Sequence, residues 1–93
     1  MNRYRQGYLA ELELMKQLKA SNEYHTVLRS AGSRSSFDVV AIGESSILLC
    51  QVKTSRGNIK AEIEKLKSLK VPTCATKQLW IYLDRSWIII TVE

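Results

Sequence analysis

The sequence contains no long apolar run: none of its apolar segments approaches the about 20 residues that cross a lipid bilayer. Cysteine is scarce, and the two present, Cys50 and Cys74, lack the spacing of metal-ligand motifs. There are no internal repeats, linkers or low-complexity segments, and the opening residues lead into an amphipathic pattern instead of the apolar core of a signal peptide. We therefore expect reduced thiols, no membrane association and a cytoplasmic location, which for a viral protein would be the cytoplasm of the host cell.

At 93 residues the chain is long enough for one small domain, spanning residues 1–93, but its core leaves little surplus stability, so oligomerisation is expected. Basic residues outnumber acidic ones, 14 to 9, which gives a net charge of +5 and a pI near 9.4. This excess favours an anionic partner, and nucleic acid is the commonest one for a small basic domain. His25 is the single histidine and has no partner nearby in sequence, so we expect it at the surface and not as a catalytic base.

Polar residues interrupt two otherwise apolar strands in the segment 37–53. The pattern predicts two strands joined by a turn at 43–45, with Asp38 opening the first. Because successive side chains of a strand point to opposite faces, Gln51 and Lys53 share one face of the second strand. Burying such groups alone is costly, so they are paired, bound to metal or solvated at a cleft. Two interpretations stay open: a plain acid–lysine pair across strands, or a metal-dependent site.

Residues 4–20 predict an amphipathic helix. At 100° per residue its apolar stripe consists of Tyr4, Tyr8, Leu12, Met15 and Leu18. Glu11 falls in the middle of this stripe, which is unusual for a carboxylate. Either Glu11 pairs with an arginine at the edge of the stripe, or the helix packs on the sheet and aims Glu11 at the polar residues of segment 37–53.

The remaining chain predicts a strand over 24–30, a second helix and two further strands. The loop 30–36 is rich in hydroxyl groups and suits phosphate oxygens, although a plain solvated turn has the same composition. Asn58 is an N-cap candidate for the second helix, which ends before Pro72. Strands follow over 78–83 and 87–92, and the second is apolar on both faces, which implies cover from the helices or from a second subunit.

The order of elements is therefore helix, three strands, helix, two strands. The first three strands are of a length to form an antiparallel meander, and the strand–helix–strand segment after Lys53 fits a parallel crossover. This order predicts an α/β fold in which a mixed sheet of about five strands is flanked by two helices. The polar residues are expected at the strand ends, under the first helix.

With these residues in view, the chain resembles the archaeal-type Holliday junction resolvases of the restriction-endonuclease-like PD-(D/E)xK superfamily. The similarity covers nearly the whole chain. Its motifs are Arg-Gln-Gly at 5–7 with Glu-Leu-Glu-Leu at 11–14, Val-Leu-Arg-Ser-Ala-Gly-Ser at 27–33, Asp-Val-Val-Ala at 38–41, and Gln-Val-Lys at 51–53. Two residues depart from the family pattern: Phe37 precedes Asp38 where proline is common, and Gln51 replaces an acid.

The resemblance implies a site for metal-dependent phosphodiester hydrolysis. The catalytic residues it implies are Glu11, Asp38, Gln51 and Lys53. The metal ligands are Asp38, the amide oxygen of Gln51, the backbone carbonyl of Val52, and Glu11 directly or through a water. Magnesium is the expected cofactor, with Mn²⁺ able to substitute, because Mg²⁺ takes one or two carboxylates together with other hard oxygens. Candidate contacts to the DNA backbone are Arg5, Arg29, Ser30, Ser33, Arg34 and Arg56.

The function that this resemblance implies is a homodimeric Mg²⁺-dependent endonuclease that resolves four-way DNA junctions by paired incisions. Two alternatives stay open beside the function that the resemblance implies. One is another DNA nuclease of the same superfamily, with restriction-like or nicking activity on branched or duplex DNA. The other is a DNA-binding module that kept the fold and lost catalysis through Gln51, since this residue keeps an oxygen ligand but removes one negative charge.

Overall fold

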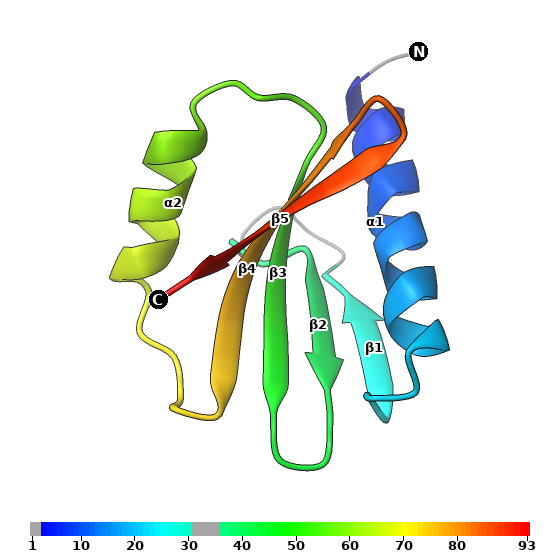
Figure 1. Ribbon diagram of the computed structural model, residues 1–93, viewed down its shortest axis with the longest axis vertical. Coiled ribbons are helices and arrows are strands. Elements are labelled where there is room, and N and C mark those ends of the chain that lie inside the picture. Colours follow the sequence, from blue (N-terminus) through cyan, green and yellow to red (C-terminus); the bar gives the residue numbers. More distant parts are fainter. Residues whose placement is uncertain (1–2, 31–35) are drawn as a thin grey trace.

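In the computed structural model, five strands form one mixed sheet between two helices (Figure 1). The structure describes residues 3–30 and 36–93, with side chains from residue 5 in the first segment, and neither helix there is long and apolar enough to cross a membrane. The elements are α1 (Arg3–Ala20), β1 (Thr26–Arg29), β2 (Val39–Ile42), β3 (Ile47–Lys53), α2 (Ile59–Ser68), β4 (Ala75–Leu83) and β5 (Ser86–Val92). The predicted α/β order is confirmed, although β1 is shorter and β4 longer than the strands predicted over 24–30 and 78–83.

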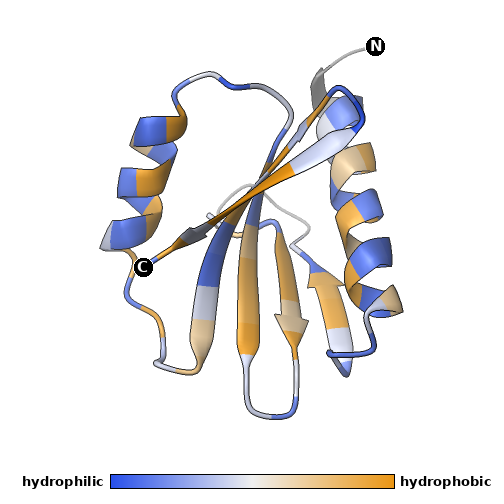
Figure 2. Cartoon of the chain, viewed as in Figure 1, coloured by the Kyte–Doolittle hydropathy of each residue, from blue (hydrophilic) through white to orange (hydrophobic). Residues whose placement is uncertain are grey.

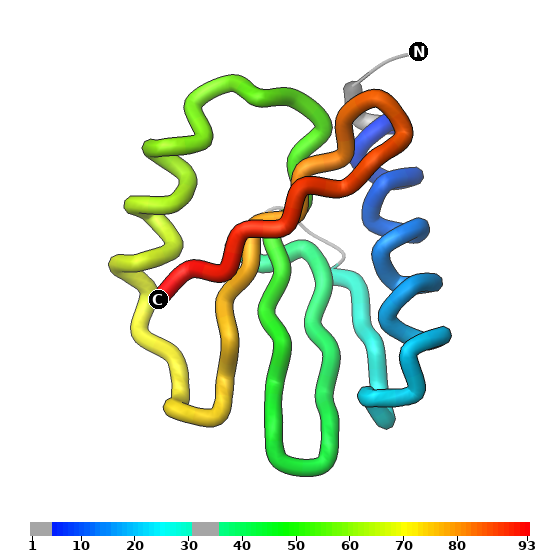
Figure 3. Tube along the Cα trace, in the orientation of Figure 1, coloured from blue at the N-terminus to red at the C-terminus, as the bar shows by residue number. Residues whose placement is uncertain are grey.

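The strands lie in the sheet in the order of the sequence, β1-β2-β3-β4-β5. The first three form the predicted antiparallel meander, α2 then leads to β4, which pairs in parallel with β3, and β5 returns antiparallel to β4. The last turn runs through Asp84 and Arg85, whose positive φ values of 50° and 64° suit a two-residue hairpin. β5 is an edge strand that crosses obliquely and ends beside α2 (Figure 3).

Each face of the sheet has its own apolar core, and Figure 2 shows apolar residues on the sides of both helices that turn toward the sheet. The core under α1 contains Ala10, Leu14, Leu18, Val27, Val39, Ala41, Leu48, Cys50, Val52 and Trp80. The core under α2 contains Leu66, Leu79, Ile81 and Val92. Since Cys50 and Val52 of β3 face α1, Gln51 and Lys53 face α2, as the alternation of the sequence predicts.

The buried face of α1 is rotated from the predicted stripe. It consists of Ala10, Leu14 and Leu18, with Met15 packed against them. Tyr8 and Leu12, which were expected in the stripe, are 41% and 38% exposed, and the side chain of Tyr4 lies outside the described residues. The small side chain of Ala10 lets the helix approach the sheet, whereas a tyrosine there would need a partner for its hydroxyl. Glu11 consequently lies at the edge of the buried face and not at its centre.

The first turn of α2 lacks the side-chain cap that the sequence suggests. Asn58 does occupy the N-cap position, but its backbone is left-handed (φ 57°, ψ 41°) and its side chain makes no cap hydrogen bond. Asparagine tolerates this conformation better than most residues do. Its backbone carbonyl accepts a hydrogen bond of 3.2 Å from the N–H of Glu62. Asn58 therefore turns the chain into the helix through its backbone.

The other end of α2 is held by a buried lysine of β4. Lys77 is only 7% exposed, and its Nζ donates to the carbonyl oxygens of Leu66 at 2.6 Å, Leu69 at 2.9 Å and Lys67 at 3.4 Å. The last carbonyls of a helix have no partner within the helix and carry the negative end of its dipole, so one ammonium group satisfies both needs. Lys77 thus ties α2 to the sheet.

We predict that Lys77→Met lowers the free energy of unfolding by about 2 kcal/mol, because hydrogen bonds from a charged donor are lost and the carbonyls stay buried. Urea unfolding followed by circular dichroism measures the change. The control is Lys60→Met, which alters an exposed lysine at the start of the same helix and should stay within about 0.5 kcal/mol of wild type. Equal effects of the two substitutions would show that Lys77 has no capping role.

Candidate active site

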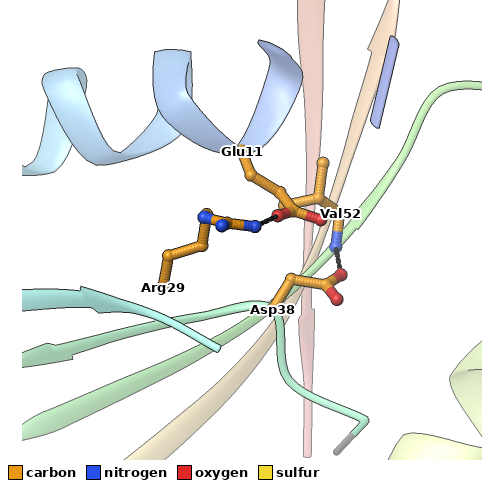
Figure 4. Close-up of polar contacts among 4 residues, drawn as sticks. All are labelled: Glu11, Arg29, Asp38 and Val52. Atoms are coloured by element: carbon orange, nitrogen blue, oxygen red, sulfur yellow. Dashed lines mark hydrogen bonds and ion pairs between the residues drawn. The ribbon is translucent and has the colours of Figure 1, made fainter. Parts of the chain in front are cut away.

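Asp38 lies immediately before β2, at the point where pairing between β2 and β3 begins. Its N–H donates to the carbonyl of Cys50 at 2.8 Å, and its own carbonyl accepts from the N–H of Ser30 at 2.8 Å. Val39 is also in register with Cys50, so two successive residues face one partner, as in a β-bulge. Bulges commonly re-aim a side chain next to an active site. Here the Asp38 carboxylate turns toward the end of β3 that extends past β2. Its Oδ2 accepts a hydrogen bond of 2.8 Å from the N–H of Val52 (Figure 4).

Glu11 extends from α1 toward this carboxylate but is hydrogen-bonded to an arginine (Figure 4). Its Oε1 accepts from Nη1 of Arg29, on β1, at 3.2 Å. The Arg29 guanidinium also lies over the ring of Tyr8, 4.7 Å from its centroid. The pairing of Glu11 with an arginine is therefore confirmed, but the arginine comes from β1 and not from the first helix. The Glu11 side chain also extends toward Asp38 (Figure 4), whose negative charge contributes to raising the pKa of Glu11.

Gln51 and Lys53 lie on the other face of the sheet, beneath α2. Gln51 is 8% exposed, and its Oε1 is buried with no hydrogen-bond partner among the described residues. Lys53 pairs with Glu62 of α2, with 3.4 Å between Nζ and Oε1. The expectation that the whole polar group lies under the first helix is thus wrong for these two residues, because strand alternation sends them away from the face on which Cys50 and Val52 pack.

Sequence reasoning missed Glu62, although a signal for it exists. Its position is three residues after Ile59 and four before Leu66, so it falls on the apolar stripe of α2. Glu11 stands out in the first helix for the same reason. Each of the two helices therefore carries one carboxylate on the side that packs on the sheet.

Burial is the main influence on the Asp38 carboxyl and raises its pKa above the usual 3.8. The hydrogen bond from the Val52 N–H and the charge of Lys53 lower the pKa in part, whereas the charge of Glu62 raises it. Charges on both sides of the sheet therefore act on this carboxyl group.

Burial also raises the pKa of Glu11, although its hydrogen bond with Arg29 opposes the shift and the charge of Asp38 adds to it. Burial, with a further contribution from Asp38, raises the pKa of Cys50 to about 12. This thiol is therefore protonated near neutral pH. Cys74 is exposed, and neither it nor Cys50 forms a disulfide among the described residues.

The candidate DNA contacts fall into three groups. Arg5 and Arg56 are exposed, Arg56 in the loop between β3 and α2. Arg29 and Ser30 are half-buried, and the Arg29 guanidinium is already engaged by Glu11. The last group, Ser33 and Arg34, lies outside the described residues.

We predict that Asp38→Asn raises the Tm of the metal-free protein at pH 7. A carboxyl whose pKa is raised on folding binds its proton more tightly in the folded state, so its ionised form lowers the free energy of unfolding once the pH exceeds the unfolded value. Asparagine removes that charge and keeps an acceptor for the Val52 N–H. The gain should vanish below the ordinary pKa of 3.8, where both states of Asp38 are protonated.

Thermal unfolding of both proteins from pH 7 to about pH 3 measures this difference. Glu13→Gln is the matched control, since Glu13 is exposed on α1, and it should leave the Tm unchanged across the range. A lower Tm for Asp38→Asn than for wild type at pH 7 would contradict the account of a costly buried charge.

Comparison with known proteins shows the family of the chain. Residues 2–81 match the family model described as archaeal Holliday junction resolvase (Hjc). A solved structure of Hjc from Archaeoglobus fulgidus, described as a Holliday junction resolvase from an archaeal hyperthermophile, is similar with a TM-score of 0.70 and 23% sequence identity over 94% of this chain and 73% of that one. No curated protein sequence matches. The chain belongs to the archaeal Holliday junction resolvases, a family of DNA endonucleases.

Proposed function

We propose that this chain acts as a homodimeric, Mg²⁺-dependent endonuclease that resolves four-way DNA junctions by paired phosphodiester hydrolysis. The observation that carries the proposal is at the end of β3. There the Asp38 carboxylate is fixed by the Val52 N–H, and the neighbouring Gln51 holds a buried amide oxygen that has no partner among the described residues. Buried polar atoms of this kind are uncommon unless a ligand or water completes them.

The residues present fit a hard divalent cation with mixed oxygen ligands. Across residues 3–30 and 36–93, no three His, Cys, Asp or Glu side chains are grouped so that they could hold a metal ion by themselves. Asp38 would supply a carboxylate and Gln51 its amide oxygen. Val52 would supply its carbonyl, since the N–H and C=O of one strand residue point to the same side and its N–H already meets Asp38. When bound, the ion supplies charge neutralisation at the phosphate and a water of lowered pKa.

The two remaining residues would act from opposite faces of the sheet. Lys53, half-buried on the α2 side, would position the attacking water or stabilise negative charge as it develops on the phosphate. Glu11, on the α1 side, would complete the set of oxygen ligands, directly or through a water. Its pairing with Arg29 keeps the carboxylate oriented toward the site.

Recognition of the junction would rest on shape and phosphate contacts. Exposed Arg5 and Arg56 are the clearest candidates among the described residues, and Arg29 and Ser30 would extend the contact from the β1 side. Ser33 and Arg34, outside the described residues, are the remaining candidates. Such contacts read the backbone and not the bases, so affinity should depend strongly on salt and weakly on sequence.

A cleavage assay on matched four-way junction, flap, nicked and linear duplex DNA tests the proposal. With Mg²⁺ the wild type should cut the junction, and Asp38→Asn, Glu11→Gln and Lys53→Ala should each lose cleavage on the order of 100-fold or more while largely keeping junction affinity. Glu13→Gln should behave as wild type.

Each contrary result has its own meaning. Equal affinity for the junction and a linear duplex would replace the resolvase proposal with another nuclease activity. Wild type that cuts nothing with Mg²⁺ or Mn²⁺ would leave a DNA-binding module. Cleavage by Asp38→Asn at the wild-type rate would overturn the site itself.

The second subunit would pack on the C-terminal edge of the sheet. The sequence points to the segment 80–92, and here β5 is an edge strand with Ile88 and Ile89 exposed by 37% and 49% on opposite faces. The helices of the same chain therefore leave part of this doubly apolar strand uncovered. Two identical sites related by a two-fold axis are the simplest means of cutting two opposed strands.

We predict that Ile89→Lys gives a folded monomer, because a charge cannot be buried unpaired in an apolar interface. Sedimentation at micromolar concentration measures the association, and circular dichroism checks the fold. Leu28→Lys is the control: Leu28 is 51% exposed on the opposite edge strand, β1, and its substitution should leave the dimer intact. A monomeric wild type, with and without DNA, would contradict a dimer altogether.

A further inference from the structure

Glu62 in the first turn of α2 is a partly buried carboxylate with no role in the site of the proposed function. Its side chain is 20% exposed, and Oε1 lies 3.4 Å from Nζ of Lys53. The second oxygen, Oε2, is buried and has no hydrogen-bond partner among the described residues. α2 follows the loop after β3 (Figure 1), and the contact with Lys53 places this carboxylate on the Lys53 side of the sheet.

Two structural roles explain only part of this arrangement. An acid in the first turn of a helix interacts favourably with the helix dipole, and an ion pair with Lys53 offsets some of the cost of burial. Both roles are available to an exposed carboxylate, and neither needs a buried oxygen without a partner. Buried polar atoms normally have at least one partner, so Oε2 points to a group that the described residues do not provide.

Gln51 gives an independent indication on the same face. More than nine-tenths of this residue is buried, and its Oε1 also lacks a partner among the described residues. Gln51, two residues before Lys53 on β3, and Glu62, which contacts Lys53, thus each hold an acceptor oxygen without a partner among the described residues. A cation is the kind of ligand that satisfies several acceptor oxygens at once.

The net charge of the site also indicates a role for Glu62. Asp38 and Lys53 cancel each other, so with a neutral residue at Gln51 these three groups carry no net charge. A Glu-Val-Lys motif at 51–53 would carry one negative charge in their place. Glu62 restores that charge, and it acts on Asp38 already, since after burial itself its charge is a further cause of the raised pKa of that carboxyl.

We propose that Glu62 supplies the second carboxylate of the divalent-metal site, in place of the acid that Gln51 replaces. The inference rests on the metal site of the proposed function and adds a residue to it. Glu62 acts on the ion directly or through one of the waters that Mg²⁺ retains. The carboxylate has moved from a strand to the facing helix, and Gln51 keeps a neutral oxygen ligand where the acid would have been.

Metal binding without DNA tests this directly. Mn²⁺ affinity is measured by electron paramagnetic resonance or calorimetry for wild type, Asp38→Asn, Glu62→Gln and Glu64→Gln, with the metal-free Tm as a check on folding. Glu62→Gln should weaken Mn²⁺ binding by on the order of 10-fold to 100-fold. Glu64→Gln, an exposed acid on the same helix, should bind as wild type does.

Two further variants separate a role at the metal from a role in holding Lys53. In a Lys53→Met background, Glu62→Gln should still weaken Mn²⁺ binding, whereas a residue that only neutralises Lys53 would have no effect there. This double variant also leaves no unpaired charge from the ion pair, so it remains informative if Glu62→Gln alone unfolds. Gln51→Glu combined with Glu62→Gln should return the affinity to within a few-fold of wild type.

The outcomes distinguish failure of the inference from failure of the proposed function. Binding that is lost in Asp38→Asn but unchanged in Glu62→Gln would overturn the role of Glu62 and leave the metal site standing. Wild type that binds no Mn²⁺, or binds it equally with Asp38→Asn, would overturn the metal site. An effect of Glu62→Gln that disappears in the Lys53→Met background would make Glu62 a partner of Lys53 only.

Discussion

The candidate site depends on the hydrogen bond from the Val52 N–H to the Asp38 carboxylate. Beyond Asp38 the meander of β2 and β3 ends, so the last N–H groups of β3 on that side have no strand to pair with. The carboxylate takes the place of a backbone acceptor. It is thereby fixed in the plane of the sheet, where neither apolar core covers it fully. Charged residues on both faces of the sheet can then influence the Asp38 carboxylate.

This position explains why a site can be built from two layers that do not touch each other. On one side of Asp38, Glu11 of α1 pairs with Arg29 of β1, and on the other, Glu62 of α2 pairs with Lys53 of β3. Each helix carries one acid on its buried stripe, and each acid is paired with a base from a strand. The sheet separates the two ion pairs, and Asp38 lies between them at the sheet's edge.

The arrangement lowers stability, which matters in a chain of 93 residues. Burial raises the pKa of both Asp38 and Glu11, so the ionised forms needed near neutral pH are disfavoured by folding. The unsatisfied oxygens of Gln51 and Glu62 add to this cost. Other contacts offset it, among them the three hydrogen bonds by which Lys77 holds the end of α2. Destabilising buried charges and unpaired oxygens gathered at one place, with stabilising contacts elsewhere in the fold, are the pattern expected of a functional site.

The element order, the α/β class and the faces of the strands could be predicted from the sequence, because they follow from periodicity and from short connections that leave few topologies. Glu11, Asp38, Gln51 and Lys53 could be picked out in the same way, since polar residues on apolar faces stand out locally. Which of them lie near one another depends on packing between distant segments. The rotation of α1 buries Ala10, Leu14 and Leu18 and places Glu11 at the edge of the core. The bulge in which Asp38 and Val39 both face Cys50 turns the Asp38 side chain toward Val52, and the packing of α2 places Glu62 next to Lys53. These outcomes depend on contacts between segments far apart in the chain, which no local pattern records.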